Sequence, residues 1–342
     1  MRVGAEATLE APVVLKYDFN VWRFQPQDQV TDAGTDVATF ADTRAADQAP
    51  ADVGGGVRLA TFNVLNYFPT TGAEYVAAGN TCTYFNDRAG NPVTNNTCSN
   101  NGPRGAADQA NLERQQAKIV AAINGLGAGI VSLEEIENSV KLGKDRDVAV
   151  GRLVTALNAS AGAGTWAFVP SPPASELPTP AQEDVIRTAF IYKPAQVSPV
   201  GASEVLIDET NFDNAREPLA QAFKAAGATD DQAFGVVVNH FKSKGSAPSS
   251  GANADTGQGG FNADRIGQAQ ALSTFADSFA ADRGIEALFL TGDFNSYTQE
   301  DPLQVLYEDD YTNLESDTEG ESTYSFGGLS GSLDHVLANP AA

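Results

Sequence analysis

The stretch that most constrains the fold is an apolar run, residues 287–290 (ALFL), followed by the polar sequence TGDFNS at 291–296. A short apolar run bounded by turn-forming residues is typical of a strand buried inside a sheet. Alternate strand residues point to the same face, so Asp293 and Asn295 are predicted to project together from the strand end. Strand ends are common places for sites in α/β proteins. The alternative is an Asx-rich turn after a core strand, with no function of its own.

Similar short runs recur along the chain, and several also end in a polar residue. Strands are predicted at residues 57–67, 130–136, 186–192, 219–223, 234–241 and 332–338. Helical spacing of apolar residues predicts helices at 113–126, 148–158 and 263–279. No Gly-x-Gly-x-x-Gly follows the first strand, and no Walker-type loop is present. The pattern therefore favours an α/β sandwich of two packed mixed sheets flanked by helices over a doubly wound parallel sheet.

Composition divides the chain into three parts. Residues 1–30 contain strand-like runs but are too few to bury a core alone. They are predicted to be the C-terminal remnant of an upstream β-domain, with strands docked on the main domain as the alternative. Residues 31–56 have linker composition, and residues 57–342 form the main domain. The first residues lack the features of a signal peptide, so the chain is either cytosolic or preceded by further residues.

The 342 residues include 21 basic and 44 acidic ones, which gives a formal net charge of −23. Such a field repels nucleic acid and anionic membranes, which argues against a protein that coats DNA through a basic face. It permits an enzyme that draws one phosphodiester into a small site neutralised by a metal and a few basic side chains. No apolar run approaches the roughly 20 residues that cross a bilayer, so no membrane association is predicted.

The two cysteines, Cys82 and Cys98, lie in a polar stretch that is predicted to be a long loop reaching to about Gly105. Their setting favours one disulfide over two free thiols and lacks the further Cys or His of a zinc site. A disulfide here would stabilise the fold by ~3 kcal/mol and would indicate an oxidising compartment.

Polar side chains at the predicted strand ends form a candidate site. They are carboxylates, carboxamides and one histidine: Asn63, Glu135, His240, Asp293, Asn295 and Asp334. Oxygen donors of this kind suit Mg²⁺, with Mn²⁺ or Ca²⁺ as alternatives, and do not suit zinc. A histidine beside such a metal serves as general acid or base, and basic neighbours stabilise charge on a phosphoryl group. The basic neighbours are Arg187, Arg216, Lys242 and Lys244.

Several residues near these strands also have an ordinary explanation. Glu134 and Glu137 are predicted to be solvated surface acids, which leaves Glu135 as the acid of the site. Tyr192 suits core packing as well as a ligand role, because aromatic strand residues usually pack. Lys242 and Lys244 are either phosphate contacts or ordinary exposed lysines.

Six motifs, in order, resemble the endonuclease/exonuclease/phosphatase superfamily of DNase I-like proteins. They are 61–68 (TFNVLNYF), 132–138 (SLEEIEN), 191–194 (IYKP), 239–245 (NHFKSKG), 291–296 (TGDFNS) and 333–335 (LDH). Two further runs are most similar to secreted bacterial nucleases of the ExeM and NucH type: 113–120 (ERQQAKIV) and 21–26 (VWRFQP), the second of which closes a small OB-like domain in that branch. The resemblance covers residues 57–339 and implies a DNase I-like sandwich and secretion.

The resemblance implies a role for each matching residue. Asn63 and Glu135 match the metal-binding pair. His240 matches the histidine that hydrogen-bonds the scissile phosphate and acts as an acid. Asp293 and Asn295 match the residues that orient the attacking water and contact the phosphate.

The remaining matches are less complete. Asp334 matches the aspartate that orients a second catalytic histidine, and the adjacent His335 is interpreted as a structural or near-site residue. The family's last strand and its Ser-Asp-His motif, which carries the general base, do not follow, so the chain is expected to be truncated at both ends. Contacts to the substrate phosphate are assigned to Arg187, Tyr192, Arg216 and Lys242.

These observations predict a metal-dependent extracellular endonuclease of low sequence specificity that cleaves DNA, with RNA as a second polymer substrate. Two alternatives stay open. One is a phosphatase of the same superfamily that acts on a small phosphoester, and the other is a truncated module that binds metal or DNA without turnover. No obligate protein partner is predicted.

Overall fold

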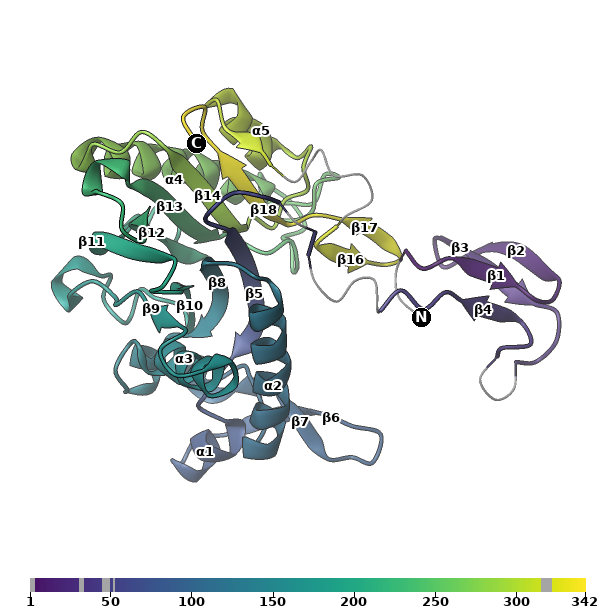
Figure 1. Ribbon diagram of the computed structural model, residues 1–342. Coiled ribbons are helices and arrows are strands. Elements are labelled where there is room, and N and C mark those ends of the chain that lie inside the picture. The colour runs from purple at the N-terminus through teal and green to yellow at the C-terminus, as the bar shows by residue number, and fades with distance from the viewer. Residues whose placement is uncertain (1–3, 31–33, 45–49, 52, 315–321) are drawn as a thin grey trace. The chain divides into compact units, whose positions relative to one another are not determined.

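The computed structural model describes residues 4–30, 34–44, 50–51, 53–314 and 322–342. The chain divides into two compact units (Figure 1). The smaller unit is Met1–Ala51 with Ser325–Ser330, and the larger is Asp52–Tyr324 with Gly331–Ala342.

Two short antiparallel strand pairs lie in the N-terminal part of the smaller unit. They are β1 (Ala7–Leu9) with β4 (Ala38–Phe40), and β2 (Val13–Asp18) with β3 (Val21–Pro26). Between β2 and β3, Phe19 and Asn20 have φ 51° and 62°, the left-handed pair that a tight two-residue hairpin requires. A two-stranded ribbon has no second layer to cover it, and Trp22 is 68% exposed.

The larger unit is built on two mixed sheets. The four-stranded sheet has the order β5-β8-β10-β9, with strands Leu59–Tyr67, Ile130–Glu137, Ile186–Tyr192 and Ala167–Phe168. The six-stranded sheet has the order β11-β12-β13-β14-β18-β15, with strands Val197–Val205, Arg216–Ala225, Phe234–His240, Leu288–Asp293, Asp334–Ala338 and Thr312–Asn313. Most neighbours are antiparallel, but β5 pairs with β8, and β13 with β14, in parallel.

Three apolar clusters hold the layers together. Helices α2 (Gln109–Gly125) and α3 (Val148–Ala161) share one cluster with the four-stranded sheet. Helices α4 (Asn262–Arg283) and α5 (Asp301–Glu308) share a second with the six-stranded sheet. A third cluster lies between the sheets, where the rings of Phe190 and Phe223 are 5.7 Å apart and each contributes about 1.5–3 kcal/mol by burial. The predicted sandwich of two mixed sheets between helices is confirmed.

The predicted long loop before residue 105 is wrong. It contains helix α1 (Gly72–Ala77) and a ribbon of β6 (Cys82–Asn86) and β7 (Pro92–Cys98). Two of the twelve ribbon residues are buried, and one of them is the polar Asn95, so the ribbon lacks the apolar alternation by which sequence patterns reveal strands. The predicted disulfide is confirmed: Cys82 and Cys98 are directly opposed in the ribbon, with Cα atoms 4.1 Å apart.

Reduction of this disulfide should lower the free energy of unfolding by ~3 kcal/mol, because the bond closes a loop with a sequence separation of 16. The check is the denaturant midpoint with and without dithiothreitol, beside a Cys82→Ser/Cys98→Ser double variant. A reductant that lowers the midpoint of the double variant as much as that of the wild type would contradict this account.

The other differences concern short or irregular elements. Strand β11 was missed because Pro199, Gly201 and a bulge interrupt its pattern. Helix α4 runs past its predicted end to Gly284, whose left-handed φ of 65° terminates it. Also missed were β9, α5, β15, β16 (Tyr324–Phe326), β17 (Leu329–Gly331) and the 3₁₀ turns Ser99–Asn101, Ser139–Leu142, Ala174–Glu176 and Asp230–Gln232. Over the described ranges, no helix has the length and apolar character needed to cross a membrane.

Candidate active site

Four polar residues stand in one row at the ends of neighbouring strands of the six-stranded sheet. The register pairs Arg216 of β12 with His240 of β13, His240 with Asp293 of β14, and Asp293 with Asp334 of β18. Directly opposed residues of paired strands present their side chains on the same face. We call these four residues the polar row. The register thus brings together strand ends that are far apart in the sequence.

Glu135 reaches the site from the other sheet through a β-bulge in β8. The pairing with β10 is interrupted there, so that Glu134 and Glu135 stand opposite the single residue Thr188. Glu135 has φ 63°, a left-handed conformation that costs on the order of 1–3 kcal/mol for a non-glycine residue and clusters at functional sites. The extra residue shifts the alternation of side chains between the two faces of the sheet. Ile136 therefore packs in the helix-covered core, and the side chain of Glu135 changes direction.

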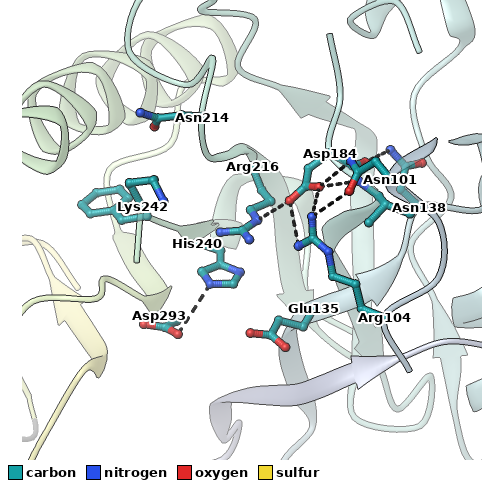
Figure 2. A network of polar contacts seen from close by, with 12 residues as sticks. Asn101, Arg104, Glu135, Asn138, Asp184, Asn214, Arg216, His240, Lys242 and Asp293 are labelled. Carbon is teal, nitrogen blue, oxygen red and sulfur yellow. Dashed lines mark hydrogen bonds and ion pairs between the residues drawn. The ribbon is translucent and has the colours of Figure 1, made fainter. Parts of the chain in front are cut away.

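Asn63 of β5 connects the acids of the two sheets. Its Nδ2 donates to Glu135 Oε1 and to Asp293 Oδ2, each at 3.2 Å, and its Oδ1 accepts the Leu65 N–H at 2.9 Å. His240 Nε2 lies 3.6 Å from Asp293 Oδ2, beyond hydrogen-bond distance. Figure 2 shows His240, Asp293 and Glu135 turned toward one common space.

Burial sets the charge state of these groups. Burial, reinforced by the charges of Asp334 and Glu135, raises the pKa of Asp293 to about 7. Burial also raises the pKa of Asp334. The pKa of His240 lies well below its usual value, because the ring is buried and faces the positive charge of Arg216. His240 is therefore neutral at pH 7, and its approach to Asp293 is not an ion pair.

Two unpaired carboxylate oxygens of the site suit a hard divalent cation. Glu135 Oε2 and Asp334 Oδ1 are buried without a hydrogen-bond donor among the described residues, a costly state that a cation relieves. Asn63 turns its amide N–H groups to the carboxylates, so ligation through its oxygen requires the amide to turn over. Within the described ranges, no group of three or more His, Cys, Asp or Glu side chains is arranged to hold a metal ion.

These buried acids should make the metal-free protein less stable as pH rises. Asp293 and Glu217 each have a pKa of about 7 in the folded chain, both chiefly through burial. A carboxyl with a raised pKa binds its proton more tightly when folded, so its stabilisation is complete below the unfolded pKa, about 4, and is lost as pH rises through 7. For Asp293 the loss is ~4 kcal/mol at most.

The check is the thermal midpoint in EDTA at pH 5 and at pH 8, which should be lower at pH 8. Addition of MgCl₂ or MnCl₂ at pH 8 should recover part of the difference, since a bound cation stabilises the folded state. A midpoint that rises with pH in EDTA and ignores both cations would contradict the assignment.

Arg216 is held by two residues that the sequence pattern missed. Asp184 accepts from Arg216 Nε at 3.2 Å and from Arg104 Nη2 at 2.7 Å (Figure 2). One signal was available for Asp184, because it lies two residues before the strand predicted at 186–192, at the edge where Glu135 lies. Arg104 lies in a loop and has no comparable signal.

Two predicted phosphate contacts are placed away from the polar row. Arg187 is buried, and its guanidinium pairs with Asp147 at 2.8 Å and donates to backbone carbonyls. Tyr192 lies at the far end of β10 from Glu135, because β10 runs antiparallel to β8, and its ring packs against Phe223. We therefore correct both assignments: Arg187 makes a buried ion pair, and Tyr192 packs beside the inter-sheet core.

Asn295 does not project beside Asp293 as strand alternation predicted. It lies beyond the end of β14 with φ 47°, which breaks the alternation. Its backbone N–H donates to Asp293 Oδ1 at 2.9 Å, and its side-chain amide donates to the Phe241 carbonyl at 3.1 Å. Asn295 thus fixes the Asp293 carboxylate and the end of β13.

His335 is fully buried, with Nε2 2.9 Å from the Ser296 carbonyl. Lys242 places its Nζ 4.3 Å from the centre of the Phe261 ring. Lys244 Nζ donates to the Gln258 carbonyl at 2.7 Å and pairs with a glutamate. The charge of Lys242 lies near that of Arg216.

Glu134 and Glu137 correct a further expectation, because both are fully buried rather than solvated. Glu134 accepts from the Thr61 hydroxyl at 2.8 Å, and Glu137 accepts the Thr70 N–H at 2.9 Å. Acidic residues at a strand end can be buried when local donors pair with them, which residue type alone does not reveal.

No protein-family profile and no curated protein matches this chain. Solved structures do show similarity. The human Nocturnin catalytic domain with bound sulfate is 16% identical, with TM-score 0.42, over 67% of this chain and 75% of that one. An endonuclease/exonuclease/phosphatase family protein from Bacteroides thetaiotaomicron is 10% identical, with TM-score 0.45, over 68% and 79%. Sphingomyelinase C from Streptomyces griseocarneus is 17% identical, with TM-score 0.42, over 67% and 77%.

Proposed function

We propose that this chain is a metal-dependent phosphodiesterase, an extracellular endonuclease that hydrolyses DNA, with RNA as a second polymer substrate. The observation that carries the proposal is the polar row facing Glu135 across the sheet ends. It joins a guanidinium, a neutral imidazole and acids with unpaired oxygens, the parts that phosphoryl chemistry needs. The motifs that resemble the nuclease superfamily fall on the same residues and support this substrate class.

The chain's own residues bind the phosphate and receive the proton. Arg216 binds a phosphoryl oxygen, and neutral His240 donates a ring N–H to a second one. Asp293, with a pKa of about 7, accepts a proton from the attacking water as the water oxygen bonds to phosphorus. The phosphorus–oxygen bond to the leaving group breaks, and the departing oxygen takes a proton from solvent water. Asn63 and the Asn295 N–H keep the Asp293 carboxylate in place. Mg²⁺, Mn²⁺ or Ca²⁺ held by Glu135 and Asp334 would neutralise negative charge on the phosphoryl group.

The disulfide supports a secreted location, because disulfides persist in oxidising compartments. The net charge of −23 opposes the approach of a polyanion, so a nuclease of this composition depends on local positive charge. Arg216 and Lys242 lie near His240 and supply that charge (Figure 2).

The test of the proposal is the product that forms. The chain is incubated with labelled single- and double-stranded DNA oligonucleotides and, separately, with p-nitrophenyl phosphate, in MgCl₂, MnCl₂ or CaCl₂ and in EDTA. We expect internal DNA cleavage that needs a cation and little release of inorganic phosphate. Phosphate released from the monoester with intact DNA would identify a phosphatase instead, and the absence of both products would overturn the proposal of an enzyme.

A further inference from the structure

Asp184 is the residue that fixes the Arg216 guanidinium. Its Oδ2 accepts from Arg216 Nε at 3.2 Å, and its two oxygens accept from Arg104 Nη1 and Nη2 at 3.3 and 2.7 Å. The Val185 N–H adds a further bond at 2.7 Å. Burial alone would raise the pKa of Asp184, but the charges of Arg216 and Arg104 outweigh it and hold that pKa below its usual value. Asp184 is therefore a carboxylate throughout the neutral range.

Bonding through Nε leaves the outer fork of Arg216, Nη1 and Nη2, available for a ligand. Among the described residues, no acceptor takes a hydrogen bond from either nitrogen. Figure 2 shows this guanidinium between Asp184 and His240, beside the polar row. The two outer nitrogens of a guanidinium match the spacing of two phosphate oxygens. Asp184 thus accepts a hydrogen bond from Nε of Arg216, while Nη1 and Nη2 face the site.

Asp184 is in turn tied to the strand that carries Glu135. Asn138, directly after β8, donates its side-chain amide to the Asp184 carbonyl at 3.0 Å and its backbone N–H to the Val185 carbonyl at 2.7 Å. These bonds fix the Asp184 backbone relative to the end of β8. The geometry of Arg216 is therefore coupled to that of Glu135 in the other sheet.

Arg104 holds Asp184 from the opposite side. Its Nη2 also donates to Asn101 Oδ1 at 3.2 Å, so both outer nitrogens of Arg104 are engaged. The carbonyls on either side of it, Pro103 and Gly105, accept from the side chain and backbone N–H of Asn95, at 3.1 and 2.9 Å. Asn95 belongs to β7 of the disulfide ribbon, so the ribbon sets the position of Arg104.

We propose that Asp184 is a positioning residue that aims the outer fork of Arg216 at the phosphodiester, and that Arg104 supports Asp184 rather than the substrate. The inference rests on the proposed function and deepens it. It makes phosphate binding depend on a carboxylate, a group that would otherwise repel the substrate. Removal of its charge releases Arg216 to rotate away from His240.

The first test is a double-mutant cycle. Asp184→Asn keeps the shape of the side chain and removes its charge, and it should lower kcat/KM for a DNA oligonucleotide by about 10- to 100-fold, mainly through KM. In an Arg216→Lys background, the same change should have little further effect, because the two residues act as one unit. If the loss of kcat/KM in the double variant equals the product of the losses in the two single variants, the proposal is overturned. Asp184→Glu, which keeps the charge, should recover part of the loss.

Asp147→Asn is the matched control, because Asp147 also pairs with an arginine, Arg187, away from the polar row. It should lower the unfolding midpoint and leave KM unchanged, which separates positioning from general stability. Arg104→Gln removes the charged group that donates to Asp184, and it should raise KM as Asp184→Asn does. It keeps the proposal testable where Asp184→Asn does not fold, and an unchanged KM in folded Arg104→Gln would overturn the supporting role of Arg104.

The second test needs no turnover. Binding of inorganic phosphate to the EDTA-treated chain is measured by isothermal titration calorimetry, and Asp184→Asn and Arg216→Lys should each weaken it about 10-fold, whereas Asp147→Asn should not. If the variants change phosphate binding as expected but the wild type hydrolyses nothing, the proposed function is rejected and the inference stands. Equal results for wild type and Asp184→Asn would overturn the inference whatever the activity.

Discussion

Glu135→Gln should lower cation-dependent DNA hydrolysis by roughly 10³-fold or more, because a bound cation stabilises the transition state by several kcal/mol. The substitution keeps the size of the side chain and removes its charge. Glu135 Oε2 has no donor among the described residues, so little besides cation binding is lost. The charge of Glu135 also raises the pKa of Asp293, so the variant should be slightly more stable than the wild type in EDTA at pH 8. Lost activity with gained stability is the expected signature.

The control is Glu176→Gln, the same chemical change at an exposed position. It should retain wild-type activity and the wild-type response to EDTA. Initial rates over a MnCl₂ titration and thermal midpoints of both variants provide the check. Wild-type rates in Glu135→Gln, or inactivity that merely follows unfolding, would remove Glu135 from the site.

His240→Asn should lower kcat by about 10²- to 10⁴-fold with little change in stability, the range expected for a side chain that assists proton transfer or holds the phosphoryl oxygen. His240 Nδ1 is buried without a hydrogen-bond partner among the described residues, so the substitution breaks no hydrogen bond at that atom. The pH–rate profile of the wild type should show no step from His240 near pH 6.5, because burial and the charge of Arg216 hold the pKa of that ring well below this value.

His335 is the matched control, since the chain has only two histidines. Its Nδ1 lies 3.0 Å from Asn313 Nδ2 and its Nε2 lies 2.9 Å from the Ser296 carbonyl, both in the core. His335→Ala should lower the free energy of unfolding by ~2–4 kcal/mol, through a cavity and lost hydrogen bonds, and leave kcat per folded molecule unchanged. A His335→Ala variant that is stable but inactive would show instead that His335 is the histidine of the site.

The sandwich was predictable because its central strands are apolar for most of their length. Strand β10 has the bounds that its pattern predicted, Ile186–Tyr192, and six of its seven residues are buried. Elements without a continuous apolar face were not predictable. Two of the twelve residues of the disulfide ribbon are buried, and β11 is broken by Pro199 and Gly201. A periodic pattern of apolar residues arises when one face of an element is buried, and these elements have too little buried surface to produce one.

The polar row was predictable in outline, because strands that pair in register bring their end residues together. His240, Asp293 and Asp334 are predicted strand-end residues, and the strand register places them side by side, while their roles in a site stay predictions. The direction of individual side chains was not predictable, since a one-residue bulge at Glu135 or a left-handed Asn295 reverses it without changing composition. Tyr192 illustrates a second limit: a motif specifies residue type but not which end of a strand faces the site.

Cleavage of supercoiled plasmid by the 342-residue chain tests the central claim most directly. Wild type and Glu135→Gln are incubated side by side in MgCl₂ or MnCl₂, with and without EDTA, and the plasmid forms are separated on a gel. The account predicts nicked circles from the wild type with a cation, and none with EDTA or with the variant. Plasmid left intact by the wild type with every cation, or nicked equally in EDTA, would contradict it.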